Sequence, residues 1–185
     1  MTRLRALFRP ANLLIVLAGA AALAGMMATQ PDYNSAVQPF VSHAAPGDWA
    51  ETRLIRARFD GWRTADRIVP PDGRARDTGG VFLIADLTLA GRDTSTMVDA
   101  AWIGATGRRY AATRRVSGLP LQLDDLWLQP GLDSRAMTMF ELPPDEIAGG
   151  ALALTLRLDP ALDGTLRLAP PMSPPAHRAV ESVAP

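Results

Sequence analysis

Two hydrophobic patterns divide this chain of 185 residues. Residues 11–28 form an almost unbroken apolar run, in which Asn12 is the one polar residue. At a rise of about 1.5 Å per residue, a helix of this length spans about 27 Å, close to the hydrocarbon thickness of a bilayer. Three arginines precede the run: Arg3, Arg5 and Arg9. This charge bias predicts a cytoplasmic basic N-terminus over residues 1–10 and a transmembrane signal-anchor helix over residues 11–28.

The same segment also has the pattern of a cleaved signal peptide. Ala22-Leu23-Ala24 is an A-x-A site, and cleavage after it would leave an apolar region of ordinary length. The apolar run continues through Met26 and Met27 to Ala28, which a cleaved protein would not need, so we favour the uncleaved anchor. Either alternative places the rest of the chain outside the cytoplasm.

Beyond the first fifty residues, apolar and polar positions alternate with a period of two, which is typical of β-strands. The clearest stretch is Val81–Leu89, where every second residue is apolar and the intervening positions begin apolar and end polar. This pattern predicts a central strand that is covered fully on one face and partly on the other. Similar stretches are residues 53–59, 98–102, 110–116, 134–142, 152–158 and 166–168.

These stretches are short and are separated by turn residues such as Asp60-Gly61 and Gly149-Gly150. They predict an all-β fold, an immunoglobulin-like antiparallel β-sandwich of about seven strands over residues 49–168. Residues 29–48 contain several prolines and no sustained period, which predicts a linker. Residues 169–185 are also rich in proline, and we expect a disordered tail there.

Composition narrows the possible functions. The chain has nineteen basic and nineteen acidic residues, and three of the basic ones precede the apolar run. The exported part therefore has a small negative balance, which gives no reason to expect a nucleic-acid surface. Cysteine is absent, which excludes disulfides, lipoprotein attachment and thiolate metal sites.

Candidate catalytic and metal-binding residues are scattered. His43 and His177 fall in the predicted linker and tail, away from the core, so neither is placed to act as a base. Met137 and Met139 share one face of a predicted strand, where packing explains them better than copper. Asp86 and Asp99 on facing strands are weak candidates for an enzyme. We therefore expect no catalytic residue, no cofactor and no metal site.

A cluster of arginines is the best candidate for a partner surface. Arg108, Arg109, Arg114 and Arg115 lie within eight residues around one predicted hairpin. They suit either the protection of a sheet edge, which we favour, or contact with an acidic partner. Trp127 and Trp62 are candidates for an exposed aromatic patch, because aromatic residues are enriched at interfaces, whereas Trp102 is expected in the core.

Several short phrases resemble those of immunoglobulin-like (telokin-like) exported bacterial domains, which are related to a secreted mycobacterial immunoprotective antigen. They are TADRI at 64–68, GVFLIADLTL at 80–89, TGRRY at 106–110, QPG at 129–131 and FELPPD at 140–145. Thr106 departs from the pattern, since an acidic residue or Asn usually precedes this turn glycine. The resemblance implies the sandwich fold and transfers no catalytic residue.

The sequence thus predicts a single-pass protein of the cell inner membrane that presents its C-terminal β-sandwich to the periplasm. We expect the sandwich to bind another cell-envelope protein without catalysis, through strand edges, the arginine cluster or Trp127. The alternative is a cleaved, soluble secreted domain that binds a small ligand or metal.

Overall fold

The computed structural model describes four segments of the chain: residues 10–29, 40–116, 118–157 and 164–183, with side chains from residue 14 onward. The chain divides into two units, Met1–Gln38 and Pro39–Pro185, which we describe separately.

The first unit contains one helix, α1 (Pro10–Thr29), and its described side chains are all exposed. Within the described residues, no helix is both long enough and apolar enough to cross a membrane. α1 confirms that this segment forms a helix. The assignment of residues 11–28 as a transmembrane segment is not supported. The predicted N-terminal segment over residues 1–10 lies almost entirely outside the described residues.

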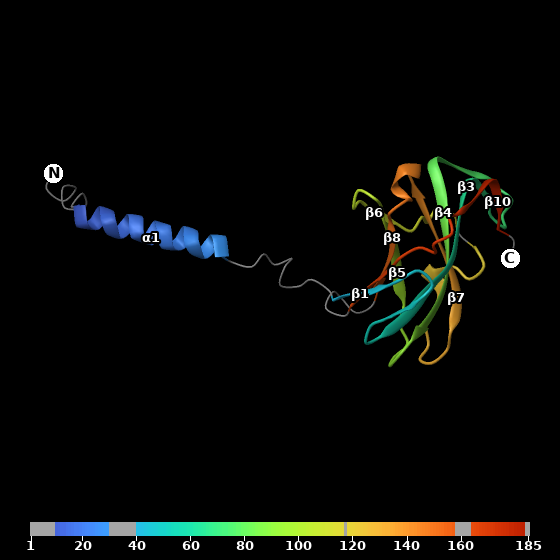
Figure 1. The fold of residues 1–185 in the computed structure, drawn as a ribbon, viewed down its shortest axis with the longest axis horizontal. Coiled ribbons are helices and arrows are strands. Elements are labelled where there is room, and N and C mark those ends of the chain that lie inside the picture. The colour runs from blue at the N-terminus through green and yellow to red at the C-terminus, as the bar shows by residue number, and fades with distance from the viewer. Residues whose placement is uncertain (1–9, 30–39, 117, 158–163, 184–185) are drawn as a thin grey trace. The chain divides into compact units, whose positions relative to one another are not determined.

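The second unit is a sandwich of two five-stranded sheets, which face each other in Figure 1. Sheet A has the order β1-β9-β8-β5-β6, and sheet B has the order β10-β3-β4-β7 with β2 beside β3. The strands of sheet A are β1 (Val41–Ala44), β5 (Val98–Ile103), β6 (Arg109–Ala111), β8 (Ala151–Leu156) and β9 (Thr165–Leu168). Those of sheet B are β2 (Trp49–Glu51), β3 (Ile55–Val69), β4 (Arg76–Gly91), β7 (Ser134–Leu142) and β10 (Ala176–Ser182).

The sandwich differs from the predicted one in strand number, boundaries and direction. The described residues form ten strands where about seven were predicted. β1 lies in the predicted linker, and β10 lies in the segment that was predicted to be disordered. β1 pairs in parallel with β9 and β10 pairs in parallel with β3, so the sandwich is mixed and not wholly antiparallel.

The main core lies between the two sheets. Its largest fully buried side chains come from both sheets and include Trp102, Phe59 and Phe140. Trp102 stacks on Trp62 with 6.0 Å between the ring centroids and contacts Phe140 from the other sheet. The prediction that Trp102 belongs to the core is confirmed, and Trp62 packs against the same core.

A second, smaller core covers part of the outer face of sheet B. Phe82 and Ile84 of β4 and Met137 and Met139 of β7 point away from the main core, since side chains alternate along a strand. They are covered by Val116 and Leu119 of the connection between β6 and β7, and by Val183 after β10. β4 is thus buried on both faces over residues 81–85, as its sequence pattern predicts.

Candidate functional site

The structure divides the predicted arginine cluster between two sides of the sandwich. Arg108 precedes β6 and its guanidinium lies 5.9 Å from the ring centroid of Tyr110. Arg109 is the first residue of β6, the edge strand of sheet A. Arg115 instead forms an ion pair with Glu141 of β7 and also bonds the Asp77 carbonyl. The four arginines therefore do not form one continuous surface.

Two members of the cluster do lie together. Arg109 and Arg114 line a groove of about 390 Å³ beside β6, which we call the β6 groove. Both side chains are exposed, and within the described residues neither makes a hydrogen bond or ion pair. The groove also contains two carboxylates, those of Asp99 and Asp124.

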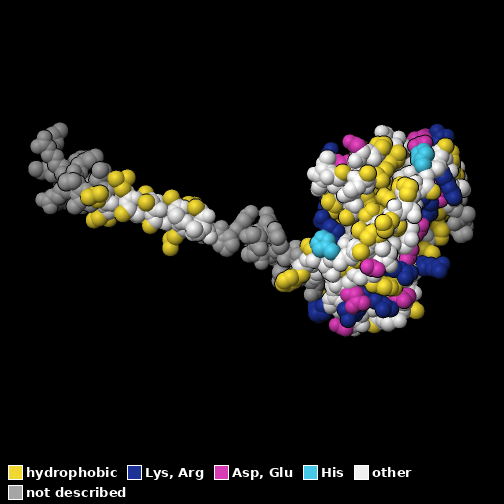
Figure 2. All heavy atoms as spheres, in the orientation of Figure 1, with side chains coloured by type: hydrophobic (Ala, Val, Ile, Leu, Met, Phe, Trp, Pro, Cys, Tyr) yellow, Lys and Arg dark blue, Asp and Glu magenta, His cyan; other side chains and the backbone are white. Residues whose placement is uncertain are grey.

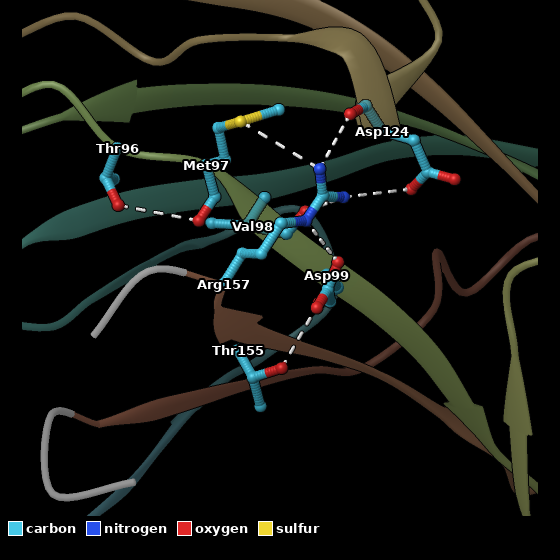
Figure 3. A network of polar contacts seen from close by, with 7 residues as sticks. All are labelled: Thr96, Met97, Val98, Asp99, Asp124, Thr155 and Arg157. Atoms are coloured by element: carbon cyan, nitrogen blue, oxygen red, sulfur yellow. Dashed lines mark hydrogen bonds and ion pairs between the residues drawn. The ribbon is translucent and has the colours of Figure 1, made fainter. Parts of the chain in front are cut away.

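A third arginine engages both of these carboxylates from within the fold (Figure 3). Arg157, which follows β8, donates from Nε to Asp99 Oδ1 at 2.7 Å. Its Nη1 donates to the Asp124 carbonyl at 2.9 Å, and its Nη2 lies 3.5 Å from Asp124 Oδ1. Asp124 belongs to a short 3-10 helix, η1 (Leu123–Asp125), so this network fixes η1 against β5.

The carboxylates of the β6 groove are therefore already bonded within the fold, whereas its two arginines can still bind another molecule. Asp99 and Asp124 share the single positive charge of Arg157, whereas the side chains of Arg109 and Arg114 have no described hydrogen-bond or ion-pair partner. An exposed guanidinium can form paired hydrogen bonds with a carboxylate, which is the arrangement that gives arginine its preference for such groups. The groove is thus suited to an acidic group supplied from outside.

Trp127 lies in the connection between η1 and β7, with 52% of its surface exposed. This agrees with the prediction of an exposed aromatic residue, but Trp127 does not line the β6 groove. Trp62 does not share its exposure, because its ring packs on Trp102 and its Nε1 donates to the Ser173 carbonyl at 2.7 Å. The predicted aromatic patch is therefore reduced to Trp127.

Beyond the opposite end of β5, Thr106 bonds a buried carboxylate. Its backbone N–H and its hydroxyl both donate to the carboxylate of Glu146, in the 3-10 helix η2 (Pro144–Glu146). These hydrogen bonds hold the pKa of the buried Glu146 below its ordinary value. The Glu146 carbonyl accepts a bond from Trp102 Nε1 at 2.9 Å, which anchors η2 to the core. The bonds among Thr106, Glu146 and Trp102 therefore have a structural role, because they hold η2 against the core.

The other candidates are dispersed among separate elements. His43 lies in β1, and His177 in β10 bonds Thr64 with its Nδ1 at 3.1 Å. Met137 and Met139 pack in the second core. Among the described residues, no group of three or more His, Cys, Asp or Glu side chains could hold a metal ion.

Asp86 and Asp99, the weak candidates for an enzyme, lie in different sheets. Asp86 bonds Arg63 on the outer face of sheet B, and burial raises its pKa although Arg63 opposes this effect. Asp99 is held by Arg157. The structure thus does not bring the two carboxylates into one site.

The fold defines a mostly β two-sheet sandwich preceded by one helix. It is similar to a β-sandwich protein from Clostridium difficile 630, with 8% identity and a TM-score of 0.44 over 75% of this chain and 99% of that one. It is also similar to a conserved hypothetical protein from Bacillus anthracis, with 9% identity and a TM-score of 0.42 over 64% of this chain and 93% of that one. No family model and no curated protein matches the chain. The resemblance to the telokin-like family is therefore not established.

Proposed function

We propose that this protein is an extracytoplasmic, immunoglobulin-like binding module that docks on an acidic surface of another cell-envelope protein without catalysis. The main support for this proposal is that Arg109 and Arg114 line one groove with exposed guanidiniums that have no described hydrogen-bond or ion-pair partner. The groove lies beside β6, an edge strand only three residues long, where a partner can approach without displacing the core. We also propose that the chain belongs to the telokin-like family of exported bacterial domains.

Export is supported by the N-terminal pattern. An apolar helix that follows three arginines suits a secretion signal, and the structure forms a helix over Pro10–Thr29. Cell fractionation followed by determination of the mature N-terminus tests this part. A start at Gly25 in the soluble extracytoplasmic fraction would mean cleavage, and an intact Met1 in the inner-membrane fraction would mean anchoring. Recovery from the cytosol would contradict the proposal.

Docking at the β6 groove is tested by photo-crosslinking in living cells. A photoreactive residue replaces the exposed Ala111 in β6, and the matched control carries it at the exposed Arg74 in the β3–β4 connection. We expect a specific adduct from position 111 that is lost in the double variant Arg109→Glu/Arg114→Glu. Equal adducts from both positions, or an adduct that survives charge reversal, would contradict docking at this groove.

The partner that is identified must then bind directly. Charge reversal should weaken its binding to the purified chain by at least about tenfold, because two charge-assisted contacts become repulsive. The affinity should also fall as salt is raised, since exposed charges are screened over about 10 Å at 0.1 M ionic strength. Binding that is insensitive to both changes would exclude the arginines as the contact.

A further inference from the structure

A second hollow lies on the opposite sheet from the β6 groove. It is a cleft of about 530 Å³ on the outer face of sheet B, which we call the outer-face cleft. The volume is within the range of small-molecule sites. Its charged lining consists of Arg58, Asp60, Arg63, Asp86 and Arg135, and its apolar lining includes Pro120, Leu121, Met137 and Val183.

Most charges on the floor of this cleft are already paired. Arg58 forms an ion pair with Asp60 at 2.6 Å, and its guanidinium also lies over the ring of Trp49. Arg63 bonds Asp86 and, through its Nε, Glu181 of β10 at 2.7 Å. These contacts fix two of the three guanidiniums in place before any ligand arrives.

Arg135 is the exception. It lies on β7 opposite Thr88 of β4, and its side chain is exposed. In the described part of the chain it has no hydrogen bond and no ion pair. The cleft therefore has two guanidiniums that carboxylates already engage, and a third, that of Arg135, whose donors have no described acceptor and can bind an anionic group.

Leu121, in the apolar wall of the cleft, has an unusual backbone conformation. Leu121 has φ of 58°, which places a non-glycine residue in the left-handed region, and 60% of its surface is exposed. Such conformations are unfavourable for residues other than glycine and persist where the surrounding structure enforces them. Here the Leu121 carbonyl accepts the Met137 N–H at 2.8 Å, which fixes the loop to β7. The leucine side chain is thus presented beside the cleft instead of being buried.

We propose that the outer-face cleft binds a small amphipathic organic acid, with its carboxylate on Arg135 and its apolar body against Leu121 and Met137. A purely polar anion would leave the apolar wall exposed, and an uncharged apolar molecule would leave Arg135 unpaired. This site goes beyond the proposed docking at the β6 groove, because it lies on the other sheet and shares no residue with it.

The probe is octanoate, titrated into the ¹⁵N-labelled full chain and followed by amide chemical shifts. Its matched control is octanamide, which keeps the apolar chain and the shape of the head group but carries no charge. We expect saturable shifts at Leu121, Met137 and Val183 with octanoate, and binding by octanamide that is about tenfold weaker or weaker. Equal binding of the two probes, or no saturable shift with octanoate, would overturn the proposal.

Two variants locate the contact. Arg135→Gln should weaken octanoate binding about tenfold, whereas Arg74→Gln removes an exposed arginine that lines neither the cleft nor the β6 groove and should leave octanoate binding unchanged. Unchanged thermal unfolding of both variants shows that the fold is intact. If Arg135→Gln binds octanoate as the wild type does, or if Arg74→Gln weakens octanoate binding equally, the assignment of the carboxylate to Arg135 is wrong. Docking at the β6 groove is unaffected by either result.

Discussion

Arg157 and the pair Arg109 and Arg114 lie around the same groove but have opposite surroundings. Arg157 has a partly buried side chain and contacts two carboxylates and two backbone carbonyls. Arg109 and Arg114 are exposed and have no described partner. An arginine whose hydrogen bonds are met within the fold stabilises it, whereas one whose donors face water is available to another molecule. Surroundings, and not residue type, separate structural arginines from candidate binding arginines.

The same contrast recurs on sheet B. Arg63 is held between Asp86 and Glu181, whereas Arg135, which lines the same cleft, is unpaired among the described residues. Figure 2 shows that basic and acidic side chains lie side by side at the lower end of one face of the sandwich, as expected where most charges are paired internally. An arginine without a described partner therefore marks a candidate binding site in this fold.

The largest effect is expected in the core. Trp102→Ala removes the ring that stacks on Trp62 and the Nε1 donor to the Glu146 carbonyl. Replacing a buried tryptophan with alanine costs about 3–5 kcal/mol, so the free energy of unfolding in urea should fall by that amount. A loss below about 1 kcal/mol would mean that this side of the sandwich is not packed as described.

Arg157→Met should cost less, about 1–2 kcal/mol, because its partners are only partly buried and solvent screens part of the loss. Urea unfolding measures this, and Arg92→Met, which removes a more exposed ion pair with Glu51, is the control with an expected loss below about 1 kcal/mol. The variant also frees Asp99 and Asp124 beside the groove arginines, so partner binding should weaken. Equal losses in both variants would remove the distinction between the two kinds of arginine.

A pH-dependent effect is expected at Glu146. Its pKa is lowered from 4.5 in the fold by the hydrogen bonds from Thr106, so the unfolded chain binds this proton more readily. The stabilisation is therefore complete above about pH 4.5 and is lost as the pH falls through the lowered pKa. Glu146→Gln should flatten the acid limb of the stability curve, measured by urea unfolding between pH 7 and pH 3.

The matched variant for this corner is Thr106→Val. It removes the hydroxyl donor but keeps the backbone N–H that also bonds Glu146. Its acid limb should lie between those of the wild type and Glu146→Gln. If all three proteins lose stability in parallel as the pH falls, the bonds to Glu146 do not contribute as described.

The smallest effect on stability is expected for the groove arginines themselves. Arg109→Ala and Arg114→Ala remove exposed side chains without described partners, so the free energy of unfolding should change by no more than about 0.5 kcal/mol. Thermal unfolding with urea titration checks this. If the free energy of unfolding falls by about 1 kcal/mol or more in either variant, that arginine stabilises the fold, as Arg157 does, and is not free for a partner.

Strong alternation in the sequence was enough to locate the main strands. β4 and β8 were found because alternate positions are large and apolar. β10 could not be found this way, since six of its seven residues are exposed. It is held by backbone pairing with β3 and by the ion pair of Glu181 with Arg63. Parallel pairing leaves no local signature, because it joins segments more than a hundred residues apart.

The candidate site was predicted only in part. The sequence places Arg108, Arg109, Arg114 and Arg115 within one hairpin, but it does not show that the chain crosses from sheet A to sheet B between them. This crossing turns Arg115 toward Glu141 and leaves Arg114 beside Arg109. The outer-face cleft was missed because Arg58, Asp86 and Arg135 come from three strands whose register only the fold defines.

The most direct test is a charge swap between this chain and the partner crosslinked at position 111. Arg109→Glu should abolish binding, and replacing the contacting acidic residue of the partner with arginine should restore it to within about threefold of the wild-type affinity. We expect rescue by that one exchange. Loss of binding with no rescue by any acidic-to-basic exchange on the crosslinked surface would contradict docking through the β6 groove.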